Sequence, residues 1–257
     1  MPGQPVLFVG HGTPMNAIDD NRWSRGFRAL GRSLAKPRAV LAISAHWYLP
    51  ASAVTAQEHP KTIHDFGGFP EPLYEVQYPA PGDPALAADV VALSQGQVLA
   101  TRDWGLDHGT WSVLRHLFPD ADVPVVQLSM DTRLTMREHV ELGARMMPLR
   151  ERGVLIVASG NLVHNLAHAF RAWRAGDRAT PDWAIAFDAD VAQALERGDR
   201  DFLENALDSE TGRDAHPTPE HYLPLMYAIG AGGGDAVAFP IDGFDMASLS
   251  MRCVRFG

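Results

Sequence analysis

The sequence predicts an α/β protein with a mainly parallel central sheet and helices on both faces of that sheet. Short apolar runs of strand length recur along the 257 residues, and stretches of helical period separate several of them. This alternation is typical of parallel sheets, in which ligand sites collect at the carboxyl ends of the strands. Because no repeat or low-complexity linker divides the chain, we predict a single domain over residues 1–257.

Six apolar runs bounded by turn residues account for the predicted strands. They cover residues 6–9, 39–43, 123–128, 154–158, 236–239 and 249–256. Helical periodicity is found over residues 84–93, 110–118, 134–149 and 183–195. Residues 49–83 are rich in proline and weakly periodic, so we predict a long ordered loop there. Loops of this kind often serve function, and this one could close over a site.

Charge and cysteine content narrow the class of function. The chain has 22 Lys and Arg against 31 Asp and Glu, a formal net charge of −9. This charge disfavours general binding to nucleic acid or to an anionic membrane, and no apolar run approaches the ~18 residues of a membrane-spanning helix. The single cysteine, Cys253, excludes a disulfide framework and a thiolate-rich metal site. We therefore expect a cytoplasmic protein that acts on a small molecule.

The chain has 11 histidines, and several of them follow predicted strands. His11, His46 and His164 come shortly after the apolar runs 6–9, 39–43 and 154–158, and His221 precedes an apolar helical stretch. Imidazole binds Zn, Fe, Cu and Ni ions, and three histidines with an open position are typical of catalytic metal sites. Sequence spacing does not force these residues together, so four separate, hydrogen-bonded structural histidines are the alternative.

A fifth histidine, His108, precedes the helical stretch 110–118 in a glycine-containing loop. A loop histidine that is free to move suits proton transfer near neutral pH, and a structural residue at the helix start is the alternative.

His64 and His216 lie in loops near candidate site residues. No Gly-x-Ser-x-Gly motif surrounds Ser44 or Ser159, which disfavours a serine hydrolase. Four others are interpreted as solvated or structural: His59, His116, His139 and His168.

Seven short motifs run through nearly the whole chain. They are GHGTPMN (10–16), SAHW (44–47), IHDFGGFP (63–70), YPAPG (78–82), DHGTW (107–111), ASGNLVHN (158–165) and PTPEHYLPL (217–225). Together and in this order, they resemble the DOPA 4,5-dioxygenase branch of the class III extradiol ring-cleavage dioxygenases. The resemblance implies that the whole chain is one catalytic domain of this type.

The resemblance also implies a metal site at the carboxyl ends of the strands. It implies one divalent ion per chain, Zn²⁺ or Fe²⁺, bound by His11, His46 and His221. It leaves two roles open for His164, which is either a fourth ligand or a catalytic base. Glu220 stays an alternative carboxylate ligand, because related non-haem iron sites often combine two histidines with a carboxylate.

The implied reaction is extradiol cleavage of a catechol, a DOPA-like dihydroxyphenyl compound, with O2 as co-substrate and a muconic semialdehyde-type product. His108 or His164 would remove a phenolic proton, and His108 would later act as the acid. The alternative function is a zinc-dependent hydrolase or small-molecule-binding protein, since Zn²⁺ suits an all-histidine site and activates water. An aromatic substrate pocket is expected from Trp47, Phe66, Phe69 and Tyr222.

Overall fold

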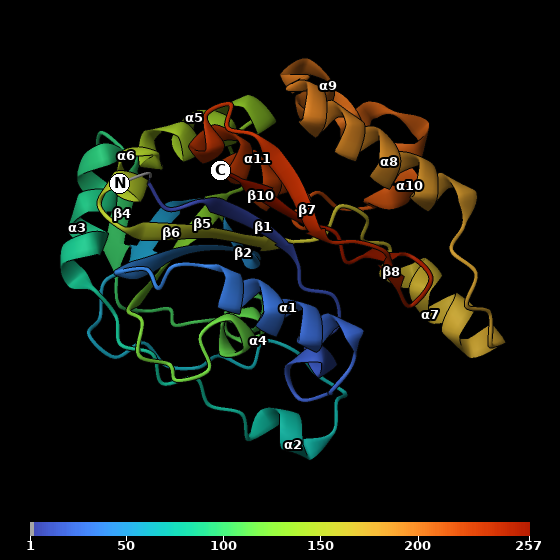
Figure 1. Cartoon of the computed structure of the whole chain (residues 1–257), viewed down its shortest axis with the longest axis horizontal. Coiled ribbons are helices and arrows are strands. Elements are labelled where there is room, and N and C mark those ends of the chain that lie inside the picture. Colours follow the sequence, from blue (N-terminus) through green and yellow to red (C-terminus); the bar gives the residue numbers. More distant parts are fainter. Residues whose placement is uncertain (1–2) are drawn as a thin grey trace.

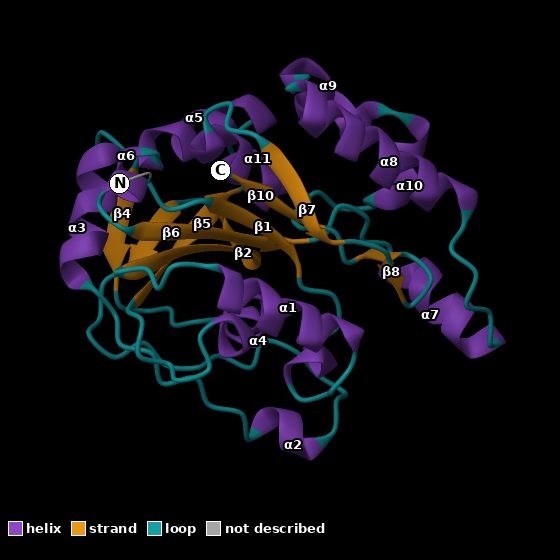
Figure 2. Cartoon of the chain, viewed as in Figure 1, coloured by secondary structure: helices purple, strands orange, loops and turns teal. Residues whose placement is uncertain are grey.

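A computed structural model describes residues 3–257, which fold around one eight-stranded sheet (Figures 1 and 2). Its strands are β1 (Val6–Gly10), β2 (Ala39–Leu49), β3 (Ser52–Thr55), β4 (Val98–Thr101), β5 (Val125–Asp131), β6 (Val154–Gly160), β7 (Val237–Ile241) and β10 (Cys253–Phe256). Their order across the sheet is β4-β3-β5-β2-β6-β1-β10-β7. The pairs β3/β4, β2/β5, β2/β6 and β1/β6 are parallel, whereas β3/β5, β1/β10 and β10/β7 are antiparallel. The predicted mainly parallel α/β fold is confirmed.

Helices cover both faces of the sheet. The helices are α1 (Arg22–Ser33), α2 (Glu71–Tyr74), α3 (Pro84–Leu93), α4 (His108–Leu117), α5 (Met136–Met146), α6 (Pro148–Glu151), α7 (Leu166–Ala175), α8 (Asp182–Arg197), α9 (Arg200–Asn205), α10 (Glu210–Ala215) and α11 (Leu223–Gly232). In Figure 1, α5, α6 and α11 lie on one side of the sheet and α1 and α4 on the other, while α7 to α10 form an outer layer at one end.

The apolar run in β1 explains how one strand contributes side chains to the core on both faces of the sheet. Val6 and Phe8 pack in the core layer formed with α5 and α11, whereas Leu7 and Val9 pack in the layer formed with α1 and α4. Successive side chains of a strand point to opposite faces. A strand that is buried on both sides therefore needs an uninterrupted apolar run, and all five residues of β1 are buried.

An irregularity in β2 lies beside the candidate site. The register of β2 against β5 shifts between Ile43 and Tyr48, and the pairing of β2 with β6 ends at Ser44. A bulge of this kind bends a strand and changes the direction of its side chains. His46 lies inside this irregular segment.

Three predicted elements differ from the structure. Residues 49–83 are not loop throughout, because they contain β3 and the one-turn helix α2; the short β3 is defined by its partners β4 and β5 and not by a local pattern. The predicted helix over residues 134–149 divides at Pro148, which cannot continue a helix and starts α6. The predicted strand over residues 249–256 is two strands, β9 (Leu249–Ser250), which pairs with β8 (Phe244–Asp245), and β10.

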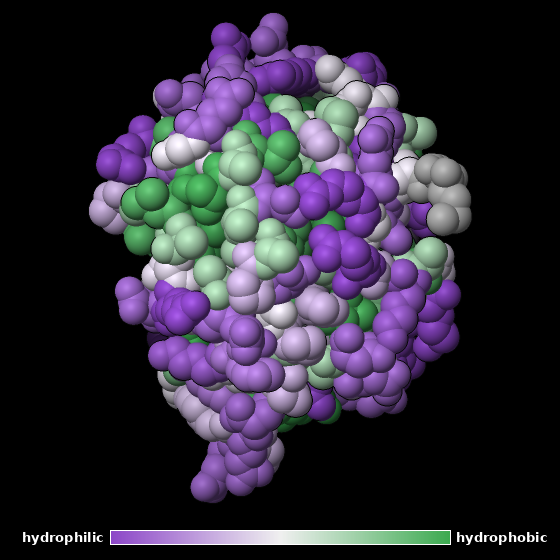
Figure 3. All heavy atoms as spheres, turned by 90° about the vertical axis from the view of Figure 1, so that its left-hand side faces the viewer, coloured by the Kyte–Doolittle hydropathy of each residue, from purple (hydrophilic) through white to green (hydrophobic). Residues whose placement is uncertain are grey.

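The molecular surface is mixed in polarity. Figure 3 views the molecule from the side of α3 and β4, and apolar atoms gather in one patch of this face. Leu99, on the edge strand β4, is 66% exposed. None of the helices within residues 3–257 combines the length and the apolar character needed to cross a membrane.

Candidate metal centre

Two of the candidate ligands are tied by backbone hydrogen bonds to the carboxyl end of β6. His11 directly follows β1, and its N–H donates to the carbonyl of Gly160 over 3.0 Å. His221 lies just before α11, and its carbonyl accepts a hydrogen bond from the N–H of Asn161 over 2.9 Å. His46 comes from the irregular part of β2. Three segments that are far apart in the sequence therefore meet at one edge of the sheet.

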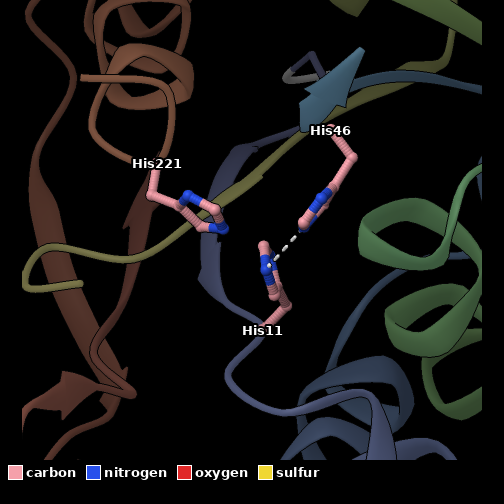
Figure 4. Close-up of side chains that lie close together, drawn as sticks. All are labelled: His11, His46 and His221. Atoms are coloured by element: carbon pink, nitrogen blue, oxygen red, sulfur yellow. Dashed lines mark hydrogen bonds between the residues drawn. The ribbon is translucent and has the colours of Figure 1, made fainter. Parts of the chain in front are cut away.

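The imidazole rings of His11, His46 and His221 converge. One donor atom from each lies within 4.8 Å of the others. The two Nε2 atoms of His11 and His46 are 3.2 Å apart, and Figure 4 shows the three rings pointing toward one another. The ring centroid of His221 lies 5.3 Å from that of His11 and 5.0 Å from that of His46.

Oxygen atoms outside the cluster occupy the Nδ1 side of each ring. Nδ1 of His11 lies 2.9 Å from Oγ of Ser159. Nδ1 of His46 lies 3.5 Å from the carboxylate of Asp65, and Nδ1 of His221 lies 3.3 Å from Glu220. An oxygen acceptor at Nδ1 favours the tautomer with its proton there, which leaves the lone pair on Nε2.

Burial keeps these imidazoles neutral. It lowers the pKa of His11, His46 and His221 well below the usual value for histidine, and the neighbouring histidines lower each of them further. Asp65 opposes the shift at His46 without reversing it. The cluster therefore offers three lone pairs and no net positive charge.

This donor set fits a divalent transition-metal ion. The Nε2 lone pairs of His11 and His46 face each other across 3.2 Å and repel unless a cation lies between them. Neutral imidazole nitrogen is a good ligand for both Zn²⁺ and Fe²⁺. Histidine ligands commonly donate their other N–H to a carboxylate, carbonyl or water, and a carboxylate stands at Nδ1 of both His46 and His221.

His164 occupies a different position from the other three. Its ring stacks on that of His221 with centroids 3.4 Å apart and planes 7° apart. It belongs to a second possible ligand group, with His221 and Glu220, rather than to the group of three. Burial, followed by nearby histidines, lowers the pKa of His164 to about 3. Glu220 also accepts a hydrogen bond from the Thr218 hydroxyl over 2.8 Å.

His108 is the first residue of α4, so of the two alternatives for its position the structure shows the helix start and not a mobile loop. Asp107 caps this helix by accepting a hydrogen bond from the N–H of Thr110 over 3.1 Å. Oδ1 of Asp65 accepts the backbone N–H of His108 over 2.9 Å and lies 3.0 Å from its Nδ1. Burial alone would raise the pKa of Asp65, but its contacts with His108 and His46 hold it below the usual value.

Sequence reasoning did not single out Asp65, and it considered Ser159 only as a nucleophile. Both lie far in the sequence from the histidines that they contact, so spacing could not reveal them. One signal was present, because each lies in a motif that also contains a histidine, residues 63–70 and 158–165. An oxygen-bearing side chain inside such a motif is a candidate partner for a ligand.

A cavity of about 300 Å³ opens onto the histidines. His11, His46, His108, His164 and His221 all contribute to its lining. A second cavity, of about 530 Å³, lies between α5, α8, α11 and β7, away from this cluster. The other side chains of the first cavity are mainly apolar: Thr13, Pro14, Phe66, Phe69, Leu166, Phe170, Met246 and Leu249.

Two of the four aromatic residues expected in the pocket line it, and two do not. Phe66 and Phe69 are in the lining. Trp47 instead stacks on a second tryptophan, with centroids 5.5 Å apart, and Tyr222 is fully buried with its hydroxyl bonded to a backbone carbonyl.

The remaining histidines have contacts of a structural kind. The Nε2 atoms of His64, His116 and His216 lie 2.8–2.9 Å from backbone carbonyl oxygens. Nδ1 of His139 and of His168 lies 3.0 and 3.2 Å from a side-chain hydroxyl. His59 is exposed. These positions agree with the interpretation of His59, His116, His139 and His168 as solvated or structural.

Comparison with known proteins gives the family. The family described as the catalytic LigB subunit of aromatic ring-opening dioxygenase matches residues 5–257. The chain is 46% identical over 260 residues to the 4,5-DOPA dioxygenase extradiol of Escherichia coli (strain K12), covering 98% of this chain and 94% of that protein. It is 39% identical to the 4,5-DOPA dioxygenase extradiol of Beta vulgaris, covering 91% of this chain and 88% of that protein.

A solved structure supports the fold. The crystal structure of an uncharacterized protein from Escherichia coli K12 matches with a TM-score of 0.85 and 42% identity, covering 99% of this chain and 100% of that one. The resemblance carried by the seven sequence motifs is thus confirmed. The chain belongs to the LigB family of aromatic ring-opening dioxygenases, in the extradiol branch that contains the 4,5-DOPA dioxygenases, and it is an oxygen-incorporating oxidoreductase.

Proposed function

We propose that this enzyme is a metal-dependent extradiol dioxygenase that opens the ring of a catechol. The substrate is a DOPA-like dihydroxyphenyl compound, O2 is the co-substrate, and the product is of the muconic semialdehyde type. The observation that carries the proposal is the convergence of three neutral imidazoles whose Nδ1 atoms face oxygen acceptors. The similarity to the 4,5-DOPA dioxygenases of Escherichia coli and Beta vulgaris supports the substrate class.

His11, His46 and His221 are the proposed ligands of one divalent ion, Zn²⁺ or Fe²⁺, and Fe²⁺ is the ion that suits ring cleavage. When bound, Fe²⁺ would hold the catechol oxygens, lower the pKa of the catechol hydroxyls and supply the redox chemistry that O2 requires. The tautomers favoured by Ser159 and Asp65 keep the Nε2 lone pairs available to it.

His108 is the proposed residue for proton transfer. Its Nδ1 faces Asp65 at 3.0 Å, so the carboxylate favours a proton on Nδ1 and leaves Nε2 free to accept one from a substrate hydroxyl. Its ring lies 3.8 Å from that of His46, centroid to centroid. A base at this distance from a ligand can reach a catechol oxygen bound beside it, and after accepting the proton it becomes the acid.

His164 is proposed as a second catalytic residue rather than a fourth ligand. The observation that favours this role is its stacking on His221, which leaves it outside the group of three converging rings. With a pKa of about 3, it meets the substrate as a neutral imidazole that can accept or donate a hydrogen bond. Because it lines the cavity, it can contact a bound ring directly.

The apolar side chains of the cavity contribute to the proposed reaction in two further ways. Phe66 and Phe69 present aromatic rings at its wall, which suits an aromatic substrate. Apolar walls also exclude water, and this strengthens the electrostatic interactions among the histidines and the substrate oxygens.

Anaerobic reconstitution of metal-free protein tests the proposed function. One sample receives Fe²⁺ and another Zn²⁺, and each is then given O2 with DOPA or a simpler catechol. We expect O2 uptake and a yellow ring-opened product with Fe²⁺ only. Protein that binds one Fe²⁺ per chain and consumes no O2 with any catechol would overturn the proposal. Zn²⁺-dependent hydrolysis in its place would favour a zinc hydrolase on the same scaffold.

A further inference from the structure

The first turn of α4 lies against two of the proposed metal ligands. The ring centroid of His108, its first residue, is 3.8 Å from that of His46 and 5.9 Å from that of His11. Gly109 leaves room for this contact, because a methyl group in place of one of its hydrogens would lie 2.8 Å from Cδ2 of His46. Two carbon atoms pack at about 3.5–4.0 Å. The position of this turn therefore sets the distance between the proposed base and the ligands.

A buried carboxylate, Asp107, attaches this turn to the sheet. Its side chain is fully buried, and its Oδ1 accepts a hydrogen bond from the N–H of Thr110 over 3.1 Å. Its Oδ2 accepts a hydrogen bond from the side-chain amide of Gln127, a fully buried residue of β5. In return, Oε1 of Gln127 accepts the backbone N–H of Asp107 over 3.2 Å. This reciprocal pair fixes the start of α4 against β5.

The Asp107 carboxylate is also connected to His46 through Ser44, the residue at which β2 stops pairing with β6. The Ser44 hydroxyl forms a hydrogen bond with the Asp107 carboxyl. Burial raises the pKa of Asp107 to about 6, so at pH 8 it is ionised and can only accept. The hydrogen of Ser44 therefore points to Asp107, and its Oγ accepts the backbone N–H of His46 over 3.2 Å.

The same turn is connected to His11 in a similar way. The carbonyl of Gly109 accepts the hydroxyl hydrogen of Ser159 over 2.6 Å, and Oγ of Ser159 lies 2.9 Å from Nδ1 of His11. One serine thus links the turn to each of these two proposed ligands. A shift of the turn would move the base and disturb both ligands together.

We propose that Asp107 is a positioning residue, which holds the first turn of α4 and the irregular segment of β2 together so that His108 lies beside the metal ligands. The proposal rests on the ring-cleavage function proposed above and adds to it a residue outside the lining of the cavity. Helix capping requires only the bond from Thr110, whereas the bonds from Gln127 and Ser44 serve the positioning role. A displacement of about 1 Å at a reacting group can lower the rate by about 100-fold.

Asp107→Asn separates positioning from capping. Asparagine caps helices about as well as aspartate, but its NH2 group would meet one of the donors that the carboxylate now binds. For the Fe²⁺-loaded enzyme at pH 8, we expect kcat from O2 uptake with a saturating catechol to fall by about 10–100-fold, with KM changed by less than about threefold. A wild-type kcat in this variant would overturn the proposal.

Asp199→Asn is the matched control for Asp107→Asn. Asp199 caps α9 in the same way, by accepting the N–H of Phe202 over 3.1 Å, and it lies in the outer layer of helices. We expect kcat and KM of this variant to equal those of the wild type. A loss of kcat as large as that of Asp107→Asn would show that the loss of a cap explains both, and would overturn the positioning role.

Metal affinity gives a measurement that does not depend on turnover. Ser44→Ala keeps the Asp107 cap and the pair with Gln127, and removes only the connection to His46. We expect Kd for Zn²⁺, measured with a competing chelator, to rise by about tenfold in Ser44→Ala and in Asp107→Asn. The double variant should rise by little more than either single one, because both changes break the same connection. Increments that multiply in the double variant would show that Asp107 does not act through Ser44.

The two proposals fail in different ways. If the Fe²⁺-loaded wild type consumes no O2 with any catechol, the ring-cleavage function is wrong, and the Zn²⁺ affinities still decide whether Asp107 positions His46. If the wild type is active and both Asp107→Asn and Ser44→Ala match it in kcat and in Kd for Zn²⁺, ring cleavage stands and the positioning role is refuted.

Discussion

The hydroxyl of Ser159 determines which nitrogen of His11 carries the proton. Oγ of Ser159 donates its one hydrogen to the carbonyl of Gly109 over 2.6 Å. Oγ also lies 2.9 Å from Nδ1 of His11 and has no second hydrogen to give, so it must accept there. The proton of His11 is therefore on Nδ1, and the Nε2 lone pair faces His46 and His221.

Removing this hydroxyl should weaken metal binding without removing a ligand. In Ser159→Ala, His11 is free to place its proton on Nε2, and partners of this kind typically contribute 10–100-fold to metal affinity or activity. We expect Kd for Zn²⁺ or Fe²⁺, measured with a competing chelator, to rise by about that factor. Ser94→Ala, which removes a buried serine hydroxyl at the end of α3 next to β4, is the control and should leave Kd unchanged. An unchanged Kd in Ser159→Ala would contradict the tautomer assignment.

Loss of a proposed ligand should reduce the stability of the protein in the presence of metal and leave the stability of the metal-free protein unchanged. His46→Ala removes one of two lone pairs that face each other across 3.2 Å, so the metal-free variant should be no less stable than the metal-free wild type. Added Zn²⁺ should stabilise the wild type by about 2.7 kcal/mol when free Zn²⁺ is about 100 times Kd, and this gain should disappear in the variant. Thermal unfolding with and without Zn²⁺ measures both. A full Zn²⁺-dependent rise in Tm for His46→Ala would rule out His46 as a ligand.

His164→Gln decides between the two roles of His164. As a catalytic residue, its loss should lower kcat by about 10²–10⁴-fold while one metal ion per chain is still bound. Metal analysis and O2 uptake on the same preparation give both quantities. Metal content that falls together with kcat would instead identify His164 as the fourth ligand.

Asp65→Asn tests a positioning residue that contacts both a proposed ligand, His46, and the proposed base, His108. The amide has nearly the same shape as the carboxylate, but its NH2 group would face Nδ1 of His46 or His108, which lie 3.5 and 3.0 Å from the native carboxylate. We expect a loss of about 10–100-fold in metal affinity and in kcat, with KM nearly unchanged. If only the free energy of unfolding changed, Asp65 would be purely structural.

The sequence predicted which histidines come together better than it predicted their surroundings, and the reason is physical. Apolar runs place His11 and His164 just beyond buried strands, and the ends of parallel strands meet at one edge of a sheet. Spacing carries no information on contacts such as that between His46 and Asp65, which depend on how a bulge and a loop come together in space. The short strands β3 and β4 escaped prediction for the same reason, since four-residue segments are defined by their partners.

A buried histidine outside the site gives the protein a defined response to acid. His139 is fully buried, and burial lowers its pKa to about 4 although Asp131 and Glu138 oppose the shift. In the unfolded chain its pKa is about 6.5. Below pH 6.5 the unfolded state takes up a proton that the folded state refuses until about pH 4. The neutral, buried state of His139 therefore contributes fully to the free energy of unfolding above pH 6.5. As the pH falls from 6.5 to 4, this contribution is lost, and the free energy of unfolding decreases by on the order of 3 kcal/mol.

His139→Gln should remove this part of the pH dependence. Glutamine can still bond to the Tyr227 hydroxyl, which lies 3.0 Å from Nδ1 of His139, but it does not titrate. Urea unfolding of metal-free protein at several pH values between 8 and 4 measures the effect. At pH 8 both proteins are neutral at residue 139. The difference between their free energies of unfolding at this pH therefore gives the cost of the side-chain change alone. As the pH falls, the free energy of unfolding should decrease less steeply in the variant, so the two curves converge or cross. Parallel curves would mean that His139 accepts a proton equally well in the folded and unfolded states, contrary to the effect of its burial.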